Sequence, residues 1–232
     1  MKKIFFLLFA FSAIISCKHN TPANQEQQSS GTASGSSTES TSSADKIYGI
    51  KSGILVSEMD MMGMGKATVE NNFDDYGNVS LTNTKASIMS MNTVTHNLRK
   101  DGWMYVWTEG QKEGHKIKID ASQVSKENLD IDKLTQEMKD KMKLKEEGNS
   151  DVIGKSCKVY SMTISEKGMS MAGKVYVWEK LALKSEFDAK GMKISMLPKS
   201  LDEHPNFASG FFDVPAGITF TEMQNTGQAD LN

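Results

Sequence analysis

The stretch KVYVWEKLALKSEFDAKGMKI, residues 174–194, contains the pattern that decides the fold. Apolar and polar side chains alternate along it with a period of two, which is typical of β-strands that bury one face. Asp188 to Gly191 interrupt the alternation with residues that favour a tight turn. The stretch therefore predicts neighbouring antiparallel strands over 171–179, 181–187 and 192–197.

The same alternation extends outward on both sides of this stretch. Turn residues at 62–65, at Asp74–Asn78 and at Asp101–Gly102 divide the upstream part of the chain. The strands predicted elsewhere cover 47–61, 66–74, 79–90, 92–99, 103–108, 115–120, 152–165 and 218–221, with a short helix or irregular piece around 207–212. A single sheet of about ten antiparallel strands should curve towards a barrel.

One segment changes its period. Its apolar side chains recur at three- to four-residue spacing, which predicts an amphipathic helix of about four turns; they are Leu129, Ile131, Leu134, Met138 and Met142. Asp130 is the expected N-cap and Gly148 the expected C-terminal residue. The predicted fold class is mainly β (α+β): a curved antiparallel sheet forming an unclosed barrel. The amphipathic helix would cover the opening or the concave face, with Leu134, Met138 and Met142 as a lid.

The N-terminus has the features of an export signal. Lys2 and Lys3 precede the apolar run Ile4–Ile15, which is too short to span a hydrocarbon core. Ser16 lies directly before Cys17, and this order resembles the lipobox of bacterial lipoproteins. The resemblance implies a signal peptide over 1–16, a lipid on Cys17 that binds the membrane, and, since no aspartate follows the cysteine, an outer-membrane protein facing the periplasm.

The composition of the chain after the signal peptide separates a tether from a domain. Residues 17–45 are rich in Ser, Thr and Gln and poor in large apolar residues, so they predict a disordered tether. Residues 46–232 are long enough for one domain with a core. The chain has a formal net charge of −2, without the basic surplus of a nucleic-acid-binding protein. Cys157 is the only cysteine besides Cys17, so we expect it to be a buried free thiol.

The chain holds 16 methionines, and two specialised uses of them are open beside plain core packing. Unbranched thioethers and alternating aromatic side chains suit the wall of a ligand cavity. The candidate cavity residues are Met89, Met91, Trp103, Tyr105, Trp107, Met169, Met171, Tyr176 and Trp178. The cluster Met59, Met61, Met62 and Met64 instead matches soft sites that select Cu(I), although no histidine is near it in sequence.

Signatures of catalysis are absent from the sequence. The histidines are isolated, and Gly168–Ala172 lacks the strand-to-helix context that a nucleophile elbow needs. Asp74 and Asp75 beside Gly77 are typical of a solvated turn more than of a calcium site. We therefore expect a protein that is not an enzyme and has no cofactor.

Several stretches together resemble a known family; they are YGIKSGILVSEM (48–59), FDDYGN (73–78), VIGKSCKVYSM (152–162), KVYVWEKLALKSEFDAKGM (174–192) and FDVPAGI (212–218). They are similar to a family of Bacteroidetes-type outer-membrane lipoproteins that looks related in fold to the lipoprotein localisation factors LolA and LolB. The resemblance implies an unclosed antiparallel barrel whose apolar cavity holds acyl chains. It transfers no catalytic residue. A lipid anchor, as in LolB, implies a stationary receiver or sensor and not a shuttle.

The leading hypothesis is a non-enzymatic binder of a hydrophobic ligand, a lipid or an acyl chain. It predicts an apolar pocket of roughly several hundred Å³. One alternative is a Cu(I)-binding protein that uses the Met59–Met64 cluster. The other is an envelope interaction domain with a solid core and an exposed apolar patch, whose protein partner the sequence does not identify.

Overall fold

The structure is a computed structural model, and it describes residues 46–61, 65–88, 91–119, 131–166 and 169–223. The predicted signal peptide, Cys17 and the tether lie outside the described residues. Within those ranges, no helix combines the length and the apolar character that a membrane crossing requires.

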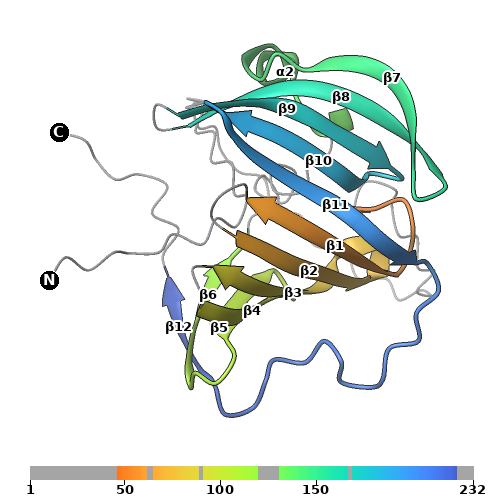
Figure 1. The fold of residues 1–232 in the computed structure, drawn as a ribbon. Helices are drawn as coiled ribbons and strands as arrows, with labels where there is room; N and C mark the ends of the chain where they lie inside the picture. The colour runs from red at the N-terminus through yellow and green to blue at the C-terminus, as the bar shows by residue number, and fades with distance from the viewer. Residues whose placement is uncertain (1–45, 62–64, 89–90, 120–130, 167–168, 224–232) are drawn as a thin grey trace, which may run out of the picture.

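A single twelve-stranded sheet forms the body of the protein (Figure 1). Its strands are β1 (Gly53–Met61), β2 (Gly65–Asp74), β3 (Val79–Ile88), β4 (Met91–Lys100), β5 (Trp103–Thr108), β6 (Glu113–Lys118), β7 (Lys145–Val152), β8 (Lys155–Glu166), β9 (Met169–Trp178), β10 (Leu181–Ala189), β11 (Met192–Asp202) and β12 (Thr219–Met223). Their order across the sheet is β12-β6-β5-β4-β3-β2-β1-β11-β10-β9-β8-β7. Neighbouring strands are antiparallel except β12, which runs parallel to β6.

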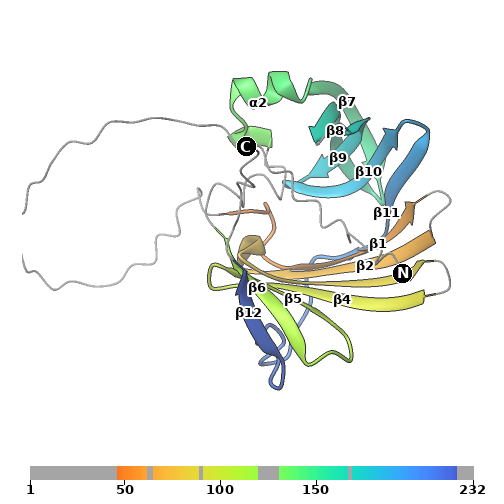
Figure 2. The same cartoon turned by 90° about the vertical axis from the view of Figure 1, so that its left-hand side faces the viewer.

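The sheet curves into an open half-barrel, so that β7–β10 lie opposite β1–β6 in Figure 2. Right-handed twist accumulates over many strands and curls a large sheet. Register shifts between Val56 and Ser57 and between Ala182 and Lys184 add local bends. The predicted unclosed antiparallel barrel is confirmed. We call the concave side of the sheet the inner face and the convex side the outer face.

Tight turns between strands follow the predicted chemistry. Asp101 and Gly102 have φ of 52° and 74°, and Lys190 and Gly191 have φ of 55° and 90°. Positive φ at both central residues defines the hairpin turn whose twist matches that of its strands. The hairpin turns predicted at these two places are therefore confirmed.

The chain enters the sheet through an end segment, Lys46–Ser52, most of which the sequence predicts as part of the first strand. Its amides bond to two turns instead: Ile47 and Tyr48 donate to the carbonyl of Tyr76, and Gly49 donates to that of Glu179. The end segment therefore joins the β2–β3 turn to the β9–β10 turn. Its apolar side chains belong to a buried cluster of Ile47, Tyr48, Leu55, Phe73, Val152, Cys157, Leu181 and Leu183.

The predicted helix of four turns is wrong in its extent. At this place the described residues form a short 3₁₀ turn, Ile131–Lys133, and the α-helix α2 (Gln136–Lys141). Thr135 is the N-cap, with its hydroxyl accepting from the amide of Met138; the predicted cap Asp130 lies outside the described residues. Gly148, the predicted helix end, lies inside β7 at a register shift, with φ of 105°.

Strand β7 replaces the second half of the predicted helix. All its residues are exposed except Val152, because β7 is an edge strand of the sheet. The sequence pattern assigns the charged residues there to the polar side of a helix. A helix and an edge strand would both leave most of these side chains in water, so the sequence pattern does not distinguish a helix from a strand here. The predicted strand over 152–165 corresponds to β8, after a turn at Ile153 and Gly154.

Candidate functional site

Helix α2 lies on the inner face and buries an apolar cluster there. Leu134 and Met142 are buried together with Tyr160 and Met162 of β8, Val175 of β9 and Phe187 of β10. Met138 packs against the same cluster, and so does Met171. The three residues predicted as the helix lid thus face the sheet, on its concave side.

The apolar surface continues across the sheet from this cluster. Cross-strand partners in a ladder point to the same face. Phe187 is opposite Ile194, and Met196 is opposite Met59, which is itself opposite Ala67. Ala67, Val69 and Ala86 are small and buried. The inner face from β8 to β1 is therefore mainly apolar, with Lys158 of β8, Ser185 of β10 and Ser57 of β1 as exceptions, and we call it the apolar wall.

A different chemistry covers the inner face of β3 and β4. Apart from Ala86, Met91 and Arg99, the described side chains there are short, polar and uncharged: Ser80, Thr82, Thr84, Thr93, Thr95 and Asn97. Thr82 donates a hydrogen bond of 3.2 Å to Asn71 on β2. The half-barrel thus places an apolar wall opposite a wall of hydroxyl and amide groups.

Charge is segregated between the two faces. The outer face carries Glu58, Asp60, Lys66, Glu70, Lys85, Lys174, Glu186, Asp188 and Lys193 at its ladder positions. On the inner face, among the described strand positions from β9 to β5, Arg99 is the one charged residue. Such a surface is unusual for a sheet in contact with water and favours contact with an apolar molecule.

Arg99 lies near the end of the half-barrel that the end segment closes. It is 9% exposed. Tyr48 of the end segment is buried beside it, in edge contact with Phe73 at a centroid distance of 4.7 Å. Burial raises the pKa of the Tyr48 hydroxyl, while the charge of Arg99 and a hydrogen bond with Asn71 act in the opposite direction. A cation, a phenol and an amide therefore gather at this end of the inner face.

Ser57 lies on the inner face of β1, at the border between the apolar wall and β2. It is 1% exposed, and its hydroxyl has no hydrogen-bond partner within the described structure. Its cross-strand partners are Val69 and Pro198, which offer no side-chain acceptor. A buried hydroxyl without a partner costs about 1–3 kcal/mol. This makes Ser57 a polar group that a bound molecule could satisfy.

The predicted cavity residues do not lie on one face. Met171 faces α2, and Met91, which is 54% exposed, occupies an inner-face position at the end of β4. Met169 is the first residue of β9, and Met89 lies outside the described residues. Trp103, Tyr105 and Trp107 share the outer face with His96, and Tyr176 and Trp178 point away from α2 because Val175 and Val177 point towards it. A period of two shows which residues share a face but not which face is concave.

The outer-face aromatic residues form a cluster of their own. The His96 ring stacks on Trp107 at 4.9 Å, and Phe220 of β12 meets both Tyr105 and Trp107 edge-on. Lys116 lies over the Trp103 ring. These contacts fix β12 to the sheet, so the cluster has a packing role on this side.

The methionine cluster proposed for Cu(I) is only partly described. Met59 occupies an inner-face position of β1 opposite Met196, and Met61 is in register with Ile194. Met62 and Met64 lie outside the described residues, so the Cu(I) hypothesis stays a prediction. No group of three or more His, Cys, Asp or Glu side chains in the described ranges could hold a metal ion.

Three further sequence features have plain structural roles. Met169 to Ala172 are part of strand β9 and not a strand-to-helix elbow. Asp74 accepts a hydrogen bond from the amide of Asp75 and caps the short turn beyond it. Cys157 is a buried free thiol, as predicted, and desolvation raises its pKa, with a smaller effect of Asp151.

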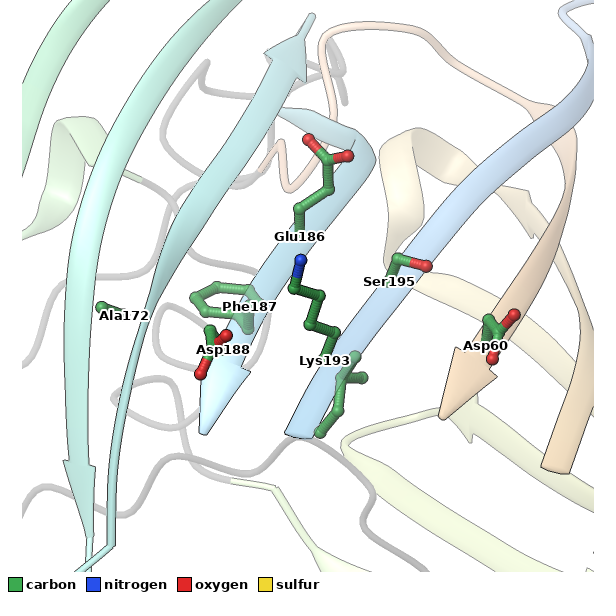
Figure 3. Close-up of a pocket in the computed structure, with 8 residues that line it drawn as sticks. Asp60, Ala172, Glu186, Phe187, Asp188, Lys193 and Ser195 are labelled. Atoms are coloured by element: carbon green, nitrogen blue, oxygen red, sulfur yellow. The ribbon is translucent and has the colours of Figure 1, made fainter. Parts of the chain in front are cut away.

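Two pockets of the structure have several polar or charged side chains in their lining. One, of about 410 Å³, lies along β10 and β11 and is lined mainly by outer-face residues, including Asp60, Glu186, Asp188 and Lys193 (Figure 3). Glu186 there accepts from the hydroxyl of Tyr176 and pairs with Lys184. A second, of about 600 Å³, lies at the ends of β3, β4 and β5 among Lys85, Asn92, Thr93 and Glu109. Neither is the apolar pocket predicted from the sequence; the apolar side chains instead line the open inner face.

Sequence patterns do not reveal Arg99, Ser57 or most of the apolar wall. Arg99 is followed by Lys100, so the pair looks like an ordinary solvated strand end. Leu98 is buried on the outer face, so alternation along β4 places Lys100 on the outer face and Arg99 on the inner face. The sequence offers no other sign that the two residues differ. Phe187 and Met196 are correctly predicted to lie in strands, but their shared face depends on register between strands. The alternation within one strand carries no information on that register.

Comparison with known proteins finds likeness only at the level of solved structures. No family model matches the chain, and no curated protein matches it. MucB, in a crystal structure with MucA(peri), is 14% identical with a TM-score of 0.43; the alignment covers 75% of this chain and 57% of the MucB chain. The lipoprotein LppX from Mycobacterium tuberculosis is 12% identical with a TM-score of 0.35, over 68% of this chain and 90% of LppX. LprF from Mycobacterium bovis is 12% identical with a TM-score of 0.36, over 71% and 91%. Sequence identities and TM-scores this low do not place the chain in a family. The resemblance to LolA and LolB therefore stays a prediction.

Proposed function

We propose that this protein is a non-enzymatic, lipid-anchored envelope protein that holds a lipid or an acyl chain on the inner face of its half-barrel, beneath α2. The observation that carries the proposal is the segregation of charge. From β9 to β5, the described strand positions keep their charged residues on the outer face, with Arg99 the exception, and this part of the concave side therefore suits an apolar molecule.

The composition of the apolar wall supports an adaptable ligand. Among the side chains that the structure describes, five methionines occupy the inner side between β8 and β1; they are Met59, Met162, Met171, Met192 and Met196. Thioether side chains are unbranched and polarizable, so they adjust to flexible chains of different lengths. A wall of this kind suits acyl chains better than a rigid ligand of one shape.

Helix α2 supplies a cover that can be exchanged for a ligand. It has six residues and is exposed on its far side, so its stability depends on the contacts of Leu134, Met138 and Met142 with the sheet. An acyl chain that enters beneath it would replace these contacts with similar ones. The lipid on Cys17 would keep the protein at the membrane that supplies such ligands.

The test is native mass spectrometry of the full chain carrying Cys17→Ser, which cannot be lipidated, with and without added hexadecanoate. We expect a co-purifying lipid, or uptake of the added acyl chain, when Cys17→Ser is the only substitution. Met196→Glu places a charge on the apolar wall and should abolish uptake.

Leu197→Glu is the matched control. Leu197 is the next residue of β11, points to the outer face and is exposed, so the same charge there should leave uptake unchanged. A protein that binds no acyl chain would contradict the proposed function. Equal loss in both variants would show that uptake does not depend on the inner face.

A further inference from the structure

Two buried polar side chains, Arg99 and Ser57, lie at defined places on the inner face. Arg99 is on β4, near the end that the end segment closes, and Ser57 is on β1, against the apolar wall. Arg99 presents a planar fork of donors that suits a carboxylate or phosphate. Ser57 presents a hydroxyl that is buried and without a partner in the described structure.

The ladders give the separation of the two groups. Ser57 is in register with Val69, Thr84 and Thr95, and Arg99 lies four residues beyond Thr95 along β4. Three strand spacings and four residues along a strand correspond to roughly 20 Å between the Cα atoms. The long side chain of Arg99 shortens the gap that a ligand must cover. The two groups could therefore contact one ligand at two different points.

The surface between and beyond the two groups indicates how such a ligand lies. Thr82, Thr84, Asn71 and Asn97 are on the Arg99 side of the inner face and can bond to a polar headgroup. Met59, Met196 and Phe187 are on the Ser57 side and can pack against an acyl chain. An ester carbonyl joins these two parts of an acyl lipid and is an acceptor for a hydroxyl.

We propose that the inner face binds an acyl-ester lipid with a single anionic headgroup. In this complex the guanidinium group of Arg99 binds the anionic headgroup, and the Ser57 hydroxyl donates a hydrogen bond to the ester carbonyl. This inference rests on the proposed function and names its ligand class. The buried cation favours an anion at one end, and the buried hydroxyl accounts for the ester at the other.

The test is a competition assay with the full chain carrying Cys17→Ser and a fluorescent acyl probe. Four competitors share a sixteen-carbon chain: 1-hexadecanoyl-glycerol 3-phosphate, its ether analogue 1-hexadecyl-glycerol 3-phosphate, the uncharged 1-hexadecanoyl-glycerol, and hexadecanoate. They vary the anion and the ester independently. Hexadecanoate distinguishes a free fatty acid from a phosphate-bearing lipid.

We expect 1-hexadecanoyl-glycerol 3-phosphate to bind at least about tenfold more tightly than the uncharged glyceride, and about fivefold more tightly than the ether. Arg99→Gln should remove the preference for the anion but keep that for the ester. Ser57→Ala should do the reverse. Lys66→Gln, on the outer face, is the charge control and should keep both preferences.

The Ser57→Ala variant also serves as a control for misfolding. Because the hydroxyl has no partner in the described structure, its removal should not lower the free energy of unfolding. Equal binding of charged and uncharged lipids, or a preference that survives Arg99→Gln, would overturn the assignment of Arg99 while leaving the proposed function intact. An ester preference that survives Ser57→Ala would overturn the role of Ser57. Failure of all four competitors to bind would reject the proposed function itself.

Discussion

The amide of Thr163 on β8 donates a hydrogen bond of 2.7 Å to the carbonyl oxygen of Met142, the C-cap residue of α2. The bond joins the C-terminal end of the helix to the sheet, beside the buried cluster to which Met142 contributes its side chain. Docking of α2 therefore depends on Met142 through both its backbone and its thioether.

Met142→Ala should lower the free energy of unfolding by about 2–4 kcal/mol, because it removes a buried side chain and leaves a cavity under the helix. Urea unfolding measures the change. Lys141→Ala, one residue earlier and exposed, should change it by less than about 0.5 kcal/mol. Similar small effects at both positions would show that α2 is not packed on the sheet in solution.

Gly53→Ala should destabilise the protein by about 1–3 kcal/mol through overpacking. A Cβ atom at this position would lie 2.5 Å from the Cζ atom of Phe73, whose side chain is fully buried. The cost should be much smaller in a Phe73→Leu background, where the ring is absent. An equal cost in both backgrounds, measured by urea unfolding, would contradict the steric explanation.

His96 should make the stability depend on pH. Desolvation lowers the pKa of its ring below the usual 6.5, Lys85 acts in the same direction, and Glu109 opposes both. A depressed pKa means that the unfolded chain takes up the proton first. The contribution of His96 is therefore complete above pH 6.5 and is lost as the pH falls through the lower folded value.

Unfolding free energies measured between pH 7.5 and pH 5 should fall less steeply in His96→Gln than in the wild type. The glutamine keeps a polar side chain that can still bond to Asn83, which lies 2.8 Å from the histidine ring nitrogen. Parallel pH profiles for the two proteins would mean that His96 titrates alike in the folded and unfolded states.

Cys157 should resist alkylation in the folded protein. Its side chain is fully buried, and the raised pKa keeps it as the unreactive thiol. In the full chain carrying Cys17→Ser, iodoacetamide at pH 8 should label the native protein on the order of a hundredfold more slowly than the protein in urea. Labelling at matching rates would place the thiol at the surface.

The sequence predicts the parts of the fold that short-range patterns specify. Alternation locates most strands, and Asp101-Gly102 and Lys190-Gly191 mark hairpins because few residues tolerate positive φ. The burial of Cys157 is also predicted correctly. These features depend on residues close together in the chain.

Sequence patterns do not predict the features that depend on residues far apart in the chain. Trp103 and Trp107 are grouped correctly on one side of their strand, but the curvature that makes this the outer face comes from the whole sheet. The charge of Arg99 acts on Tyr48 because backbone hydrogen bonds to Tyr76 and Glu179 hold the end segment at this end of the sheet. Strand β7 escapes prediction because an edge strand exposed on both sides lacks the apolar stripe that alternation requires.

The polar character of β7 has a consequence for the protein at high concentration. A sheet that does not close keeps two borders, β7 and β12, to which a strand from another molecule could add. Lys145, Glu146, Glu147 and Asp151 put charge along the longer border, and the register shift at Gly148 breaks its regular spacing. Stacking of one molecule's border on another's is therefore disfavoured by both repulsion and geometry. The half-barrel can stay open to a ligand without growing into fibrils.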